Sequence, residues 1–172
     1  MRKLQGVQGR IVYVYVLLMG LFHLYTAAAG NFEAYLQRTL HLTWVLPLAF
    51  ILFPATSRSP KDRVPVYDWI IALVSTIPGI YGILNYTMIT ERIQQVDPLT
   101  TLQIVLGTML VVFLLEATRR IVGIPLAMIA LLSILYMIFG HKMSGIMQGY
   151  EFSFAEIIEH LYLTDEGIYS MP

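Results

Sequence analysis

The 172-residue chain lacks cysteine and is poor in charge. Without cysteine it has no disulfides, no thiolate chemistry and no cysteine-ligated metal. Charged residues make up only 13% of the chain, whereas a typical soluble domain has about 25%. The net charge is zero, so the sequence offers neither a basic face for nucleic acid nor an acidic tail. These deficits favour a membrane protein over a soluble domain.

Apolar residues make up 57% of the chain, with a mean hydropathy of +0.68. They gather in five charge-free stretches of 18 to 22 residues each. About 20 helical residues cross a hydrocarbon core of about 30 Å, so each stretch is long enough to span a bilayer. The predicted fold class is all-α, a polytopic membrane protein with about five transmembrane helices. We expect the spans at residues 11–32, 39–57, 69–90, 100–117 and 121–140.

The distribution of lysine and arginine predicts the orientation. Alternating helices place eight of these residues on one side of the membrane and three on the other. Cytoplasmic loops carry the excess of positive charge, so the N-terminus is expected in the cytoplasm and the C-terminus outside. Met1-Arg2-Lys3 before an apolar run also resembles a secretory signal peptide. An uncleaved first helix is favoured, because four more spans follow.

Residues 1–140 are expected to form a transmembrane scaffold domain, and residues 141–172 an extracytoplasmic segment. Within that segment Ser153 and Glu156 have the spacing of a capping box. Apolar residues follow at helical spacing, which predicts a short amphipathic helix from about Ser153 to Leu163. It is expected on the outer membrane surface or against a partner. Its apolar stripe comprises Phe154, Ile157, Ile158 and Leu161.

The predicted spans hold little chemistry. Transport of ions or charged solutes generally requires ionisable groups at mid-membrane. All eleven Asp and Glu residues lie outside the five charge-free stretches. The chain is therefore not expected to contain a coupled transport path of its own. No catalytic motif, cofactor loop or metal-ligand spacing is visible, so no enzyme activity and no cofactor is predicted.

Two functional sites are considered for histidines and acidic residues: a proton relay and a metal site. His23 lies near the middle of the first span, but a proton relay would need a carboxylate at similar depth. A neutral histidine hydrogen-bonded to another helix is the favoured interpretation. Glu156, Glu159 and His160 do not match the spacing of a zinc motif. For these three, a solvated helix face is favoured.

The most informative segment is the charged turn, which consists of Glu116, Arg119 and Arg120. Their spacing of i, i+3 and i+4 puts them on one helix face, and they are the only formal charges between Asp97 and Lys142. In the favoured interpretation they hold a helical hairpin at the cytoplasmic surface. The alternative is a contact with another subunit or with lipid headgroups.

Two blocks of sequence carry a family resemblance. Leu115–Ala127 (LEATRRIVGIPLA) is similar to a stretch typical of fused membrane permeases of tripartite ATP-independent periplasmic (TRAP) transporters of the TAXI type. Ile157–Tyr169 (IIEHLYLTDEGIY) is similar to the junction before the large permease component in those proteins. With the order of the helices, the resemblance covers nearly the whole chain.

The resemblance implies a function and partners. The chain would match the small membrane component, a scaffold for a large ion-coupled transport component in a bacterial or archaeal inner membrane. An extracytoplasmic binding protein would deliver the solute, typically an organic acid. The fused relatives continue past the junction, whereas this sequence ends at Pro172. We therefore expect either a fragment of a fused permease or a separate subunit. The alternative function is a self-contained small oligomeric membrane protein, such as a pore or an assembly factor.

Overall fold

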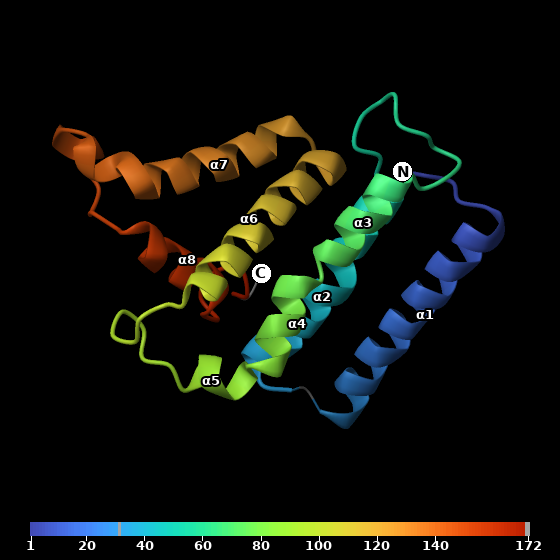
Figure 1. Cartoon of the computed structure of the whole chain (residues 1–172), viewed down its shortest axis with the longest axis horizontal. Coiled ribbons are helices and arrows are strands. Elements are labelled where there is room, and N and C mark those ends of the chain that lie inside the picture. The colour runs from blue at the N-terminus through green and yellow to red at the C-terminus, as the bar shows by residue number, and fades with distance from the viewer. Residues whose placement is uncertain (31, 171–172) are drawn as a thin grey trace. The chain divides into compact units, whose positions relative to one another are not determined.

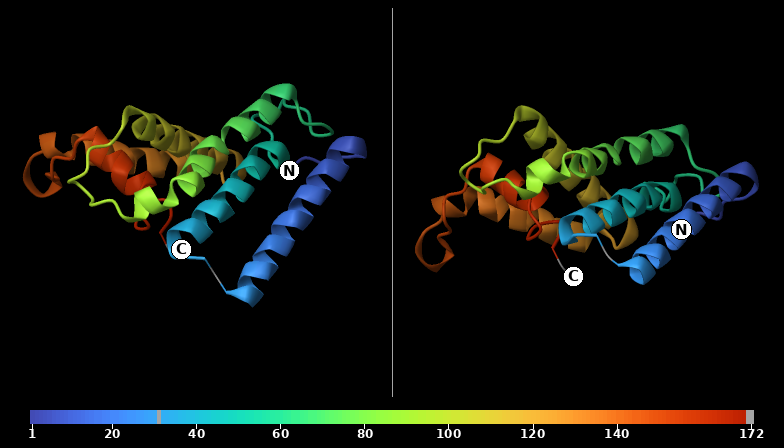
Figure 2. Two further views of the ribbon diagram at one scale, coloured as in Figure 1. Left: turned by 60° about the horizontal axis from the view of Figure 1, so that its bottom comes forward. Right: turned by 90° about the horizontal axis from the view of Figure 1, so that it is seen from below.

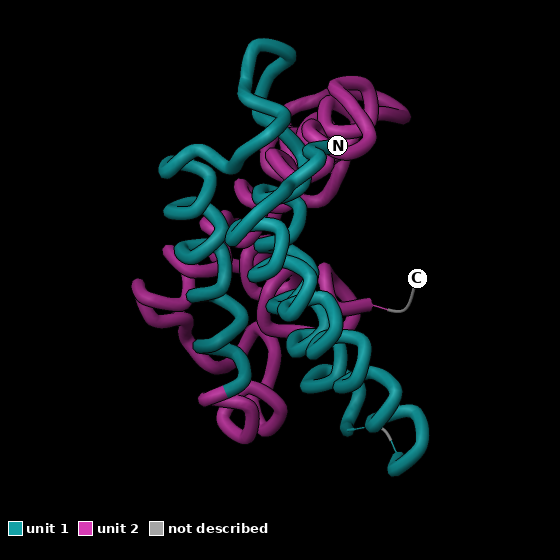
Figure 3. The backbone as a smooth tube through the Cα atoms, turned by 90° about the vertical axis from the view of Figure 1, so that its right-hand side faces the viewer, with its two compact units in different colours: residues 1–83 teal, residues 84–172 magenta. Residues whose placement is uncertain are grey.

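The computed structural model describes residues 1–30 and 32–170 (Figure 1). Their regular secondary structure is helical, with no strand. This agrees with the all-α prediction. The elements are α1 (Gly6–Ala29), α2 (Ala34–Leu52), α3 (Val66–Val74), α4 (Ile77–Leu84), α5 (Tyr86–Thr90), α6 (Thr101–Ile121), α7 (Ile124–Phe139), the 3-10 turns η1 (Gly140–Lys142) and η2 (Gly145–Met147), and α8 (Phe154–Tyr162). Two compact units divide the chain: unit 1 is Met1–Ile83, and unit 2 is Leu84–Pro172 (Figure 3).

In the described part of the chain, four helical segments are long and apolar enough to cross a membrane. They are Gly6–Ala29, Val66–Leu84, Thr101–Ile121 and Ile124–Lys142. This is compatible with a multi-pass membrane protein.

The expected fifth span, residues 39–57, is not among the four. Its helix, α2, begins earlier and ends at Leu52. Gln37, Arg38 and His41 make its first turns too polar, and Pro54 cannot continue it.

Unit 1 is organised by the packing of α2 against α3 and by a close contact between α2 and α4 (Figure 2). A Cβ added at Gly79 of α4 would overlap the Thr43 hydroxyl and lie 3.0 Å from the Thr43 Cβ. Small residues let two helices approach in this way. Ser75 and Gly79 form a small-xxx-small pair on this segment, and Gly79 is the residue that allows the close contact. The helix is interrupted at Ser75 and Thr76, just before Pro78, so α3 and α4 are separate elements.

Unit 2 is built on α6, which packs against both α7 and α8. Gly123 separates α6 from α7 with a φ of 120°, a conformation that favours glycine. Pro125 follows in the first turn of α7, where its missing N–H costs no hydrogen bond. The sequence therefore encodes a tight helical hairpin, with the charged turn on the last turns of α6.

Two of the four apolar segments are barely covered by the rest of the chain. In the most apolar 18-residue stretch of α1, only 11% of the residues are buried. In the corresponding stretch of Ile124–Lys142, only 6% are buried. Exposed apolar surface of this extent marks contact with lipid or with another protein.

The helix contact at Gly79 generates a stability prediction. Gly79→Ala should lower the free energy of unfolding of unit 1 by about 1–3 kcal/mol, because the new methyl group overpacks against Thr43. Thermal unfolding in detergent, followed by the fluorescence of Trp44 and Trp69, measures the change.

Gly20→Ala is the matched control. An added Cβ at Gly20 of α1 meets no atom within 4 Å, so this variant should unfold at the parent temperature or slightly above it. Equal unfolding temperatures for the Gly79 and Gly20 variants would contradict the close contact.

Candidate functional site

The charged turn forms ion pairs within α6. The Arg119 Nε and Nη2 donate to the two carboxylate oxygens of Glu116 at 2.7 and 2.8 Å. The Arg120 Nε donates to Glu116 Oε1 at 2.7 Å. One carboxylate therefore accepts from both arginines, as the i, i+3 and i+4 spacing predicts. The set carries a net charge of +1.

Helix geometry explains why this charge is tolerated on an apolar helix. Arg119 and Arg120 lie in the last turn of α6, where positive charge is favourable to the helix dipole. The Arg119 and Glu116 side chains are 37% and 30% exposed, so their pairing contributes only about 0.2–1 kcal/mol. The arrangement can hold a hairpin end at a membrane surface, with the Glu116 carboxylate engaged by both arginines.

A groove between α6 and α7 runs beside the charged turn. Its volume is about 300 Å³. Glu116 and Arg119 line one part of it, and the remaining lining is apolar: Val112, Leu115, Ile124, Ala127, Met128 and Leu131. The groove can take an aliphatic side chain or an acyl chain.

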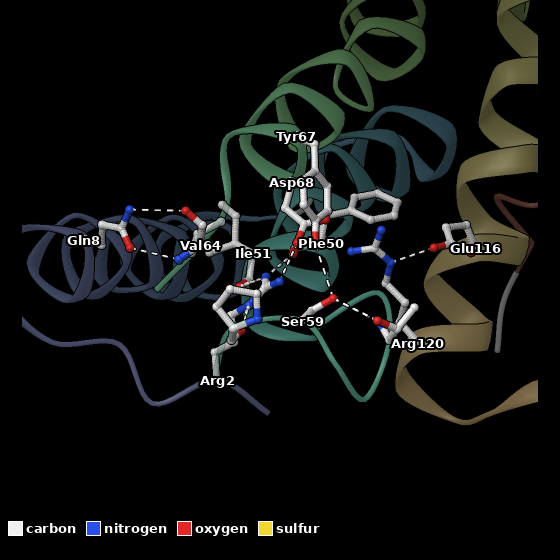
Figure 4. A network of polar contacts seen from close by, with 12 residues as sticks. Arg2, Gln8, Phe50, Ile51, Ser59, Val64, Tyr67, Asp68, Glu116 and Arg120 are labelled. Atoms are coloured by element: carbon white, nitrogen blue, oxygen red, sulfur yellow. Dashed lines mark hydrogen bonds and ion pairs between the residues drawn. The ribbon is translucent and has the colours of Figure 1, made fainter. Parts of the chain in front are cut away.

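A second set of charges, which the sequence did not predict, joins three parts of unit 1 (Figure 4). The Arg2 Nη1 donates to the backbone carbonyls of Phe50 and Ile51 at 2.9 and 2.8 Å. The Arg2 Nη2 forms an ion pair with Asp68, and the Arg2 Nε donates to Pro60 O at 3.1 Å. Arg2 is 2% exposed and Asp68 0%. The guanidinium thus closes the end of α2 and ties it to α3.

Asp68 corrects one detail of the sequence analysis. It was expected in a loop before the span 69–90, but it is the third residue of α3, within the segment Val66–Leu84. Glu116 likewise lies on a segment that is long and apolar enough to span a membrane, Thr101–Ile121. Both carboxylates can be accommodated because arginines pair with them close to a helix end. The central turns of those segments remain free of charged residues.

Unit 2 contains a third ion pair, between Arg92 and Glu159. The Arg92 Nε lies 3.0 Å from Glu159 Oε1, and the two side chains are 7% and 5% exposed. The backbone N–H of Gln95 also donates to this carboxylate, at 3.3 Å. The prediction of a solvated face for Glu159 was therefore wrong. A charge this buried requires a partner, and Arg92 supplies it from the segment before α6.

The amphipathic helix lies where the capping box predicted it. Ser153 is the N-cap of α8, and Leu163 is the C-cap. Ile157 and Ile158 are 1% and 3% exposed, and a Cβ added at Gly107 of α6 would meet Ile158 Cγ2 and Tyr162 Cδ1.

Much of the expected partner-facing stripe thus packs within unit 2. Glycine at position 107 of α6 leaves room for the side chains of Ile158 and Tyr162, so Ile158 contacts another helix of the same unit. Ile157 is buried as well. Leu161 is half-buried, and Phe154 is 48% exposed. Phe154 is the stripe residue that remains most available to a partner.

His23 lies against a second histidine. Its Nε2 is 2.6 Å from Nδ1 of His41 on α2. The two residues are each nine positions from residue 32, so an α1–α2 hairpin brings them to the same level. This symmetry was visible in the sequence but was overlooked. The contact is the interhelix polar contact considered for His23, and no carboxylate takes part in it.

The capping box of α8 sets the ionisation of Glu156. The backbone N–H of Ser153 donates to Glu156 Oε2 at 2.6 Å, and the Glu156 N–H donates to the Ser153 hydroxyl at 3.2 Å. The bonds from Ser153 hold the pKa of the Glu156 carboxyl below its ordinary value of 4.5. Within residues 1–30 and 32–170, no group of three or more His, Asp or Glu side chains could hold a metal ion.

The Arg2 network predicts a large loss of stability on substitution. Arg2→Gln should lower the free energy of unfolding by about 3–5 kcal/mol, because it leaves Asp68 buried without its partner. Arg2→Lys should restore only part of the loss, since an ammonium group lacks the planar fork that reaches Asp68 and the α2 carbonyls together. Thermal unfolding in detergent, with any tag kept away from the N-terminus, tests both variants.

The neighbouring exposed Lys3 provides the control. Lys3→Gln should change stability by no more than about 0.5 kcal/mol. If Arg2→Gln were equally mild, the Arg2 network would not stabilise unit 1.

The capping box predicts a pH dependence at the start of α8. Because the folded pKa of Glu156 is depressed, its stabilisation is complete above the unfolded value of 4.5. It is lost as the pH falls through the lower folded pKa. Hydrogen-exchange protection of the Glu156 and Ile157 amides should fall over that range.

Glu156→Gln separates this effect from other titrations. The glutamine oxygen can still accept from the Ser153 N–H, but it carries no charge. In this variant, the hydrogen-exchange protection of the same amides should not fall over the pH range in which Glu156 titrates in the parent chain. An unchanged pH profile in the variant would show that another group controls the fraying of α8.

Comparisons with protein-family models, with curated proteins and with solved structures gave no match for this chain.

Proposed function

We propose that this chain is the small membrane component of a binding-protein-dependent secondary transporter for organic acids. In this role it is a non-catalytic scaffold in a bacterial or archaeal inner membrane, with its N-terminus in the cytoplasm and its C-terminus outside. Its partners are a large ion-coupled permease component, either separate or fused, and an extracytoplasmic solute-binding protein. The transporter family in this proposal is inferred from the resemblance of two blocks, Leu115–Ala127 and Ile157–Tyr169, to TRAP permeases.

One observation supports the scaffold role above the others: the ion pairs described here lie at or beyond helix ends. Arg2–Asp68 joins the end of α2 to the start of α3, Glu116 and its arginines lie near the end of α6, and Arg92–Glu159 joins a loop to α8. A transport path would instead require ionisable or polar groups at mid-membrane, accessible to a solute or ion. Charges held in fixed pairs suit a subunit that keeps its shape while another one moves.

The uncovered faces support the need for a larger partner. Only 11% of the residues in the most apolar stretch of α1 are buried, and only 6% in that of Ile124–Lys142. The larger membrane component would cover part of this surface, and lipid would cover the rest. The charged turn lies at one end of the α6–α7 hairpin, where it can contact either.

Purification of the tagged chain from its native host in mild detergent tests the proposal. A larger polytopic membrane protein should be recovered with it in a fixed ratio. Glu116→Gln should reduce that recovery, because removing the Glu116 carboxylate changes the charge of the charged turn at the proposed contact. Native electrophoresis and mass spectrometry of the complex give the measurement.

Asp62→Asn is the matched control, since it also converts a carboxylate to an amide but lies in the exposed loop before α3. It should leave recovery unchanged. Recovery of the chain alone, as a monomer or a homo-oligomer, would contradict the scaffold role and favour the self-contained membrane protein.

A further inference from the structure

The segment that connects α7 to α8 exposes an unusual number of apolar side chains. In residues 143–152, here called the 143–152 loop, Ile146 is 103% exposed and Tyr150 82%. Three more apolar residues are exposed by 39% to 56%: Met143, Met147 and Phe152. Residues 143–150 contain no charged residue; Lys142 precedes them and Glu151 follows. An exposed cluster of this composition marks a surface that is covered in the working protein.

The loop is ordered by two hydrogen bonds that fold it back onto the end of α7. The Gly149 N–H donates to the Gly140 carbonyl at 3.0 Å. The Tyr136 hydroxyl donates to the Met147 carbonyl at 3.2 Å. The backbone of the loop therefore lies next to the end of α7 (Figure 1).

The other end of the loop is fixed by α8. Ile158 and Tyr162 of α8 pack against Gly107, which lies six residues after the start of α6, or about 9 Å along the helix axis. If α6 and α7 cross a bilayer, α8 lies close to the level at which α6 enters it. Both ends of the 143–152 loop are then held at the membrane boundary.

We propose that the 143–152 loop inserts its apolar side chains into the interfacial layer of the bilayer beside the end of α7. The occupant of this surface is lipid, because the loop continues the barely covered apolar surface of α7. Tyrosine also prefers the boundary between headgroups and acyl chains. Lys142, whose Nζ lies 5.6 Å from the centre of the Phe139 ring, can keep its charge among the headgroups while its stem stays in the apolar layer. The loop thereby sets the depth of α8.

This inference rests on the membrane location proposed above, and the experiment separates the two. Because the chain has no cysteine, single cysteines can be introduced into the full chain and labelled with an environment-sensitive fluorophore in phospholipid vesicles. The three sites are Ile146→Cys in the loop, Leu132→Cys on the exposed face of α7, and Asp165→Cys in the exposed segment after α8. Lipids with spin labels at the headgroup or at mid-chain, and an aqueous quencher, then report the depth of each site.

The proposal predicts a different best quencher for each site. The label at position 146 should be quenched most by headgroup-level spin labels, that at 132 by mid-chain spin labels, and that at 165 by the aqueous quencher. Water-like quenching at 146, with 132 still quenched from mid-chain, would overturn the loop inference and leave the membrane location intact. Water-like quenching at 132 would instead contradict the membrane location.

A protein partner on the loop gives its own result. The label at 146 would then be shielded from lipid and aqueous quenchers alike, and this outcome would also overturn the proposal. A second labelled site, Tyr150→Cys, should behave like 146, because both side chains belong to the same exposed cluster. Labels at the two sites that report different depths would contradict insertion of the loop as one surface.

Discussion

The guanidinium of Arg2 is the interaction on which unit 1 depends most. It joins residues that are 48 to 66 positions away in the sequence. The last carbonyls of an α-helix have no partner within the helix, and burying them unsatisfied is costly. Arg2 satisfies two of these carbonyls and its own backbone N–H satisfies a third, that of Leu52. The remaining charge is balanced by Asp68, so a single side chain closes one helix and positions the next.

Unit 2 also contains a buried arginine–carboxylate pair that joins distant parts of the chain. Arg92 and Glu159 are 67 positions apart, and their pairing fixes α8 near the start of α6. The charged turn also pairs a carboxylate with arginines, but locally: Arg119 and Arg120 lie one helical turn after Glu116 on the same helix. In each case an apolar helix keeps its charge near an end, in a fixed pair. This arrangement favours a rigid body over a moving part.

The sequence predicted local features well and distant pairings poorly. The α6–α7 hairpin and the capping box of α8 depend on residues a few positions apart, so glycine, proline and the cap residues were sufficient to locate them. The predicted ends of α2 were less accurate. The helix begins at Ala34 and includes the polar residues Gln37 and His41, whereas apolar content alone predicted a later start. Which arginine pairs with Asp68 or Glu159 depends on the tertiary fold, and no short pattern encodes it. His23 and His41 are an intermediate case: their contact was not predicted, although their equal spacing from residue 32 is a signal in the sequence that could have located it.

The central claim is that the chain supports transport without conducting anything itself. Flux across proteoliposomes that contain only this purified chain tests it most directly, with protein-free vesicles as the baseline and dyes for protons and sodium as the readout. The account predicts no flux above the baseline under an imposed ion gradient. Steady ion or organic-acid flux through the chain alone would contradict it.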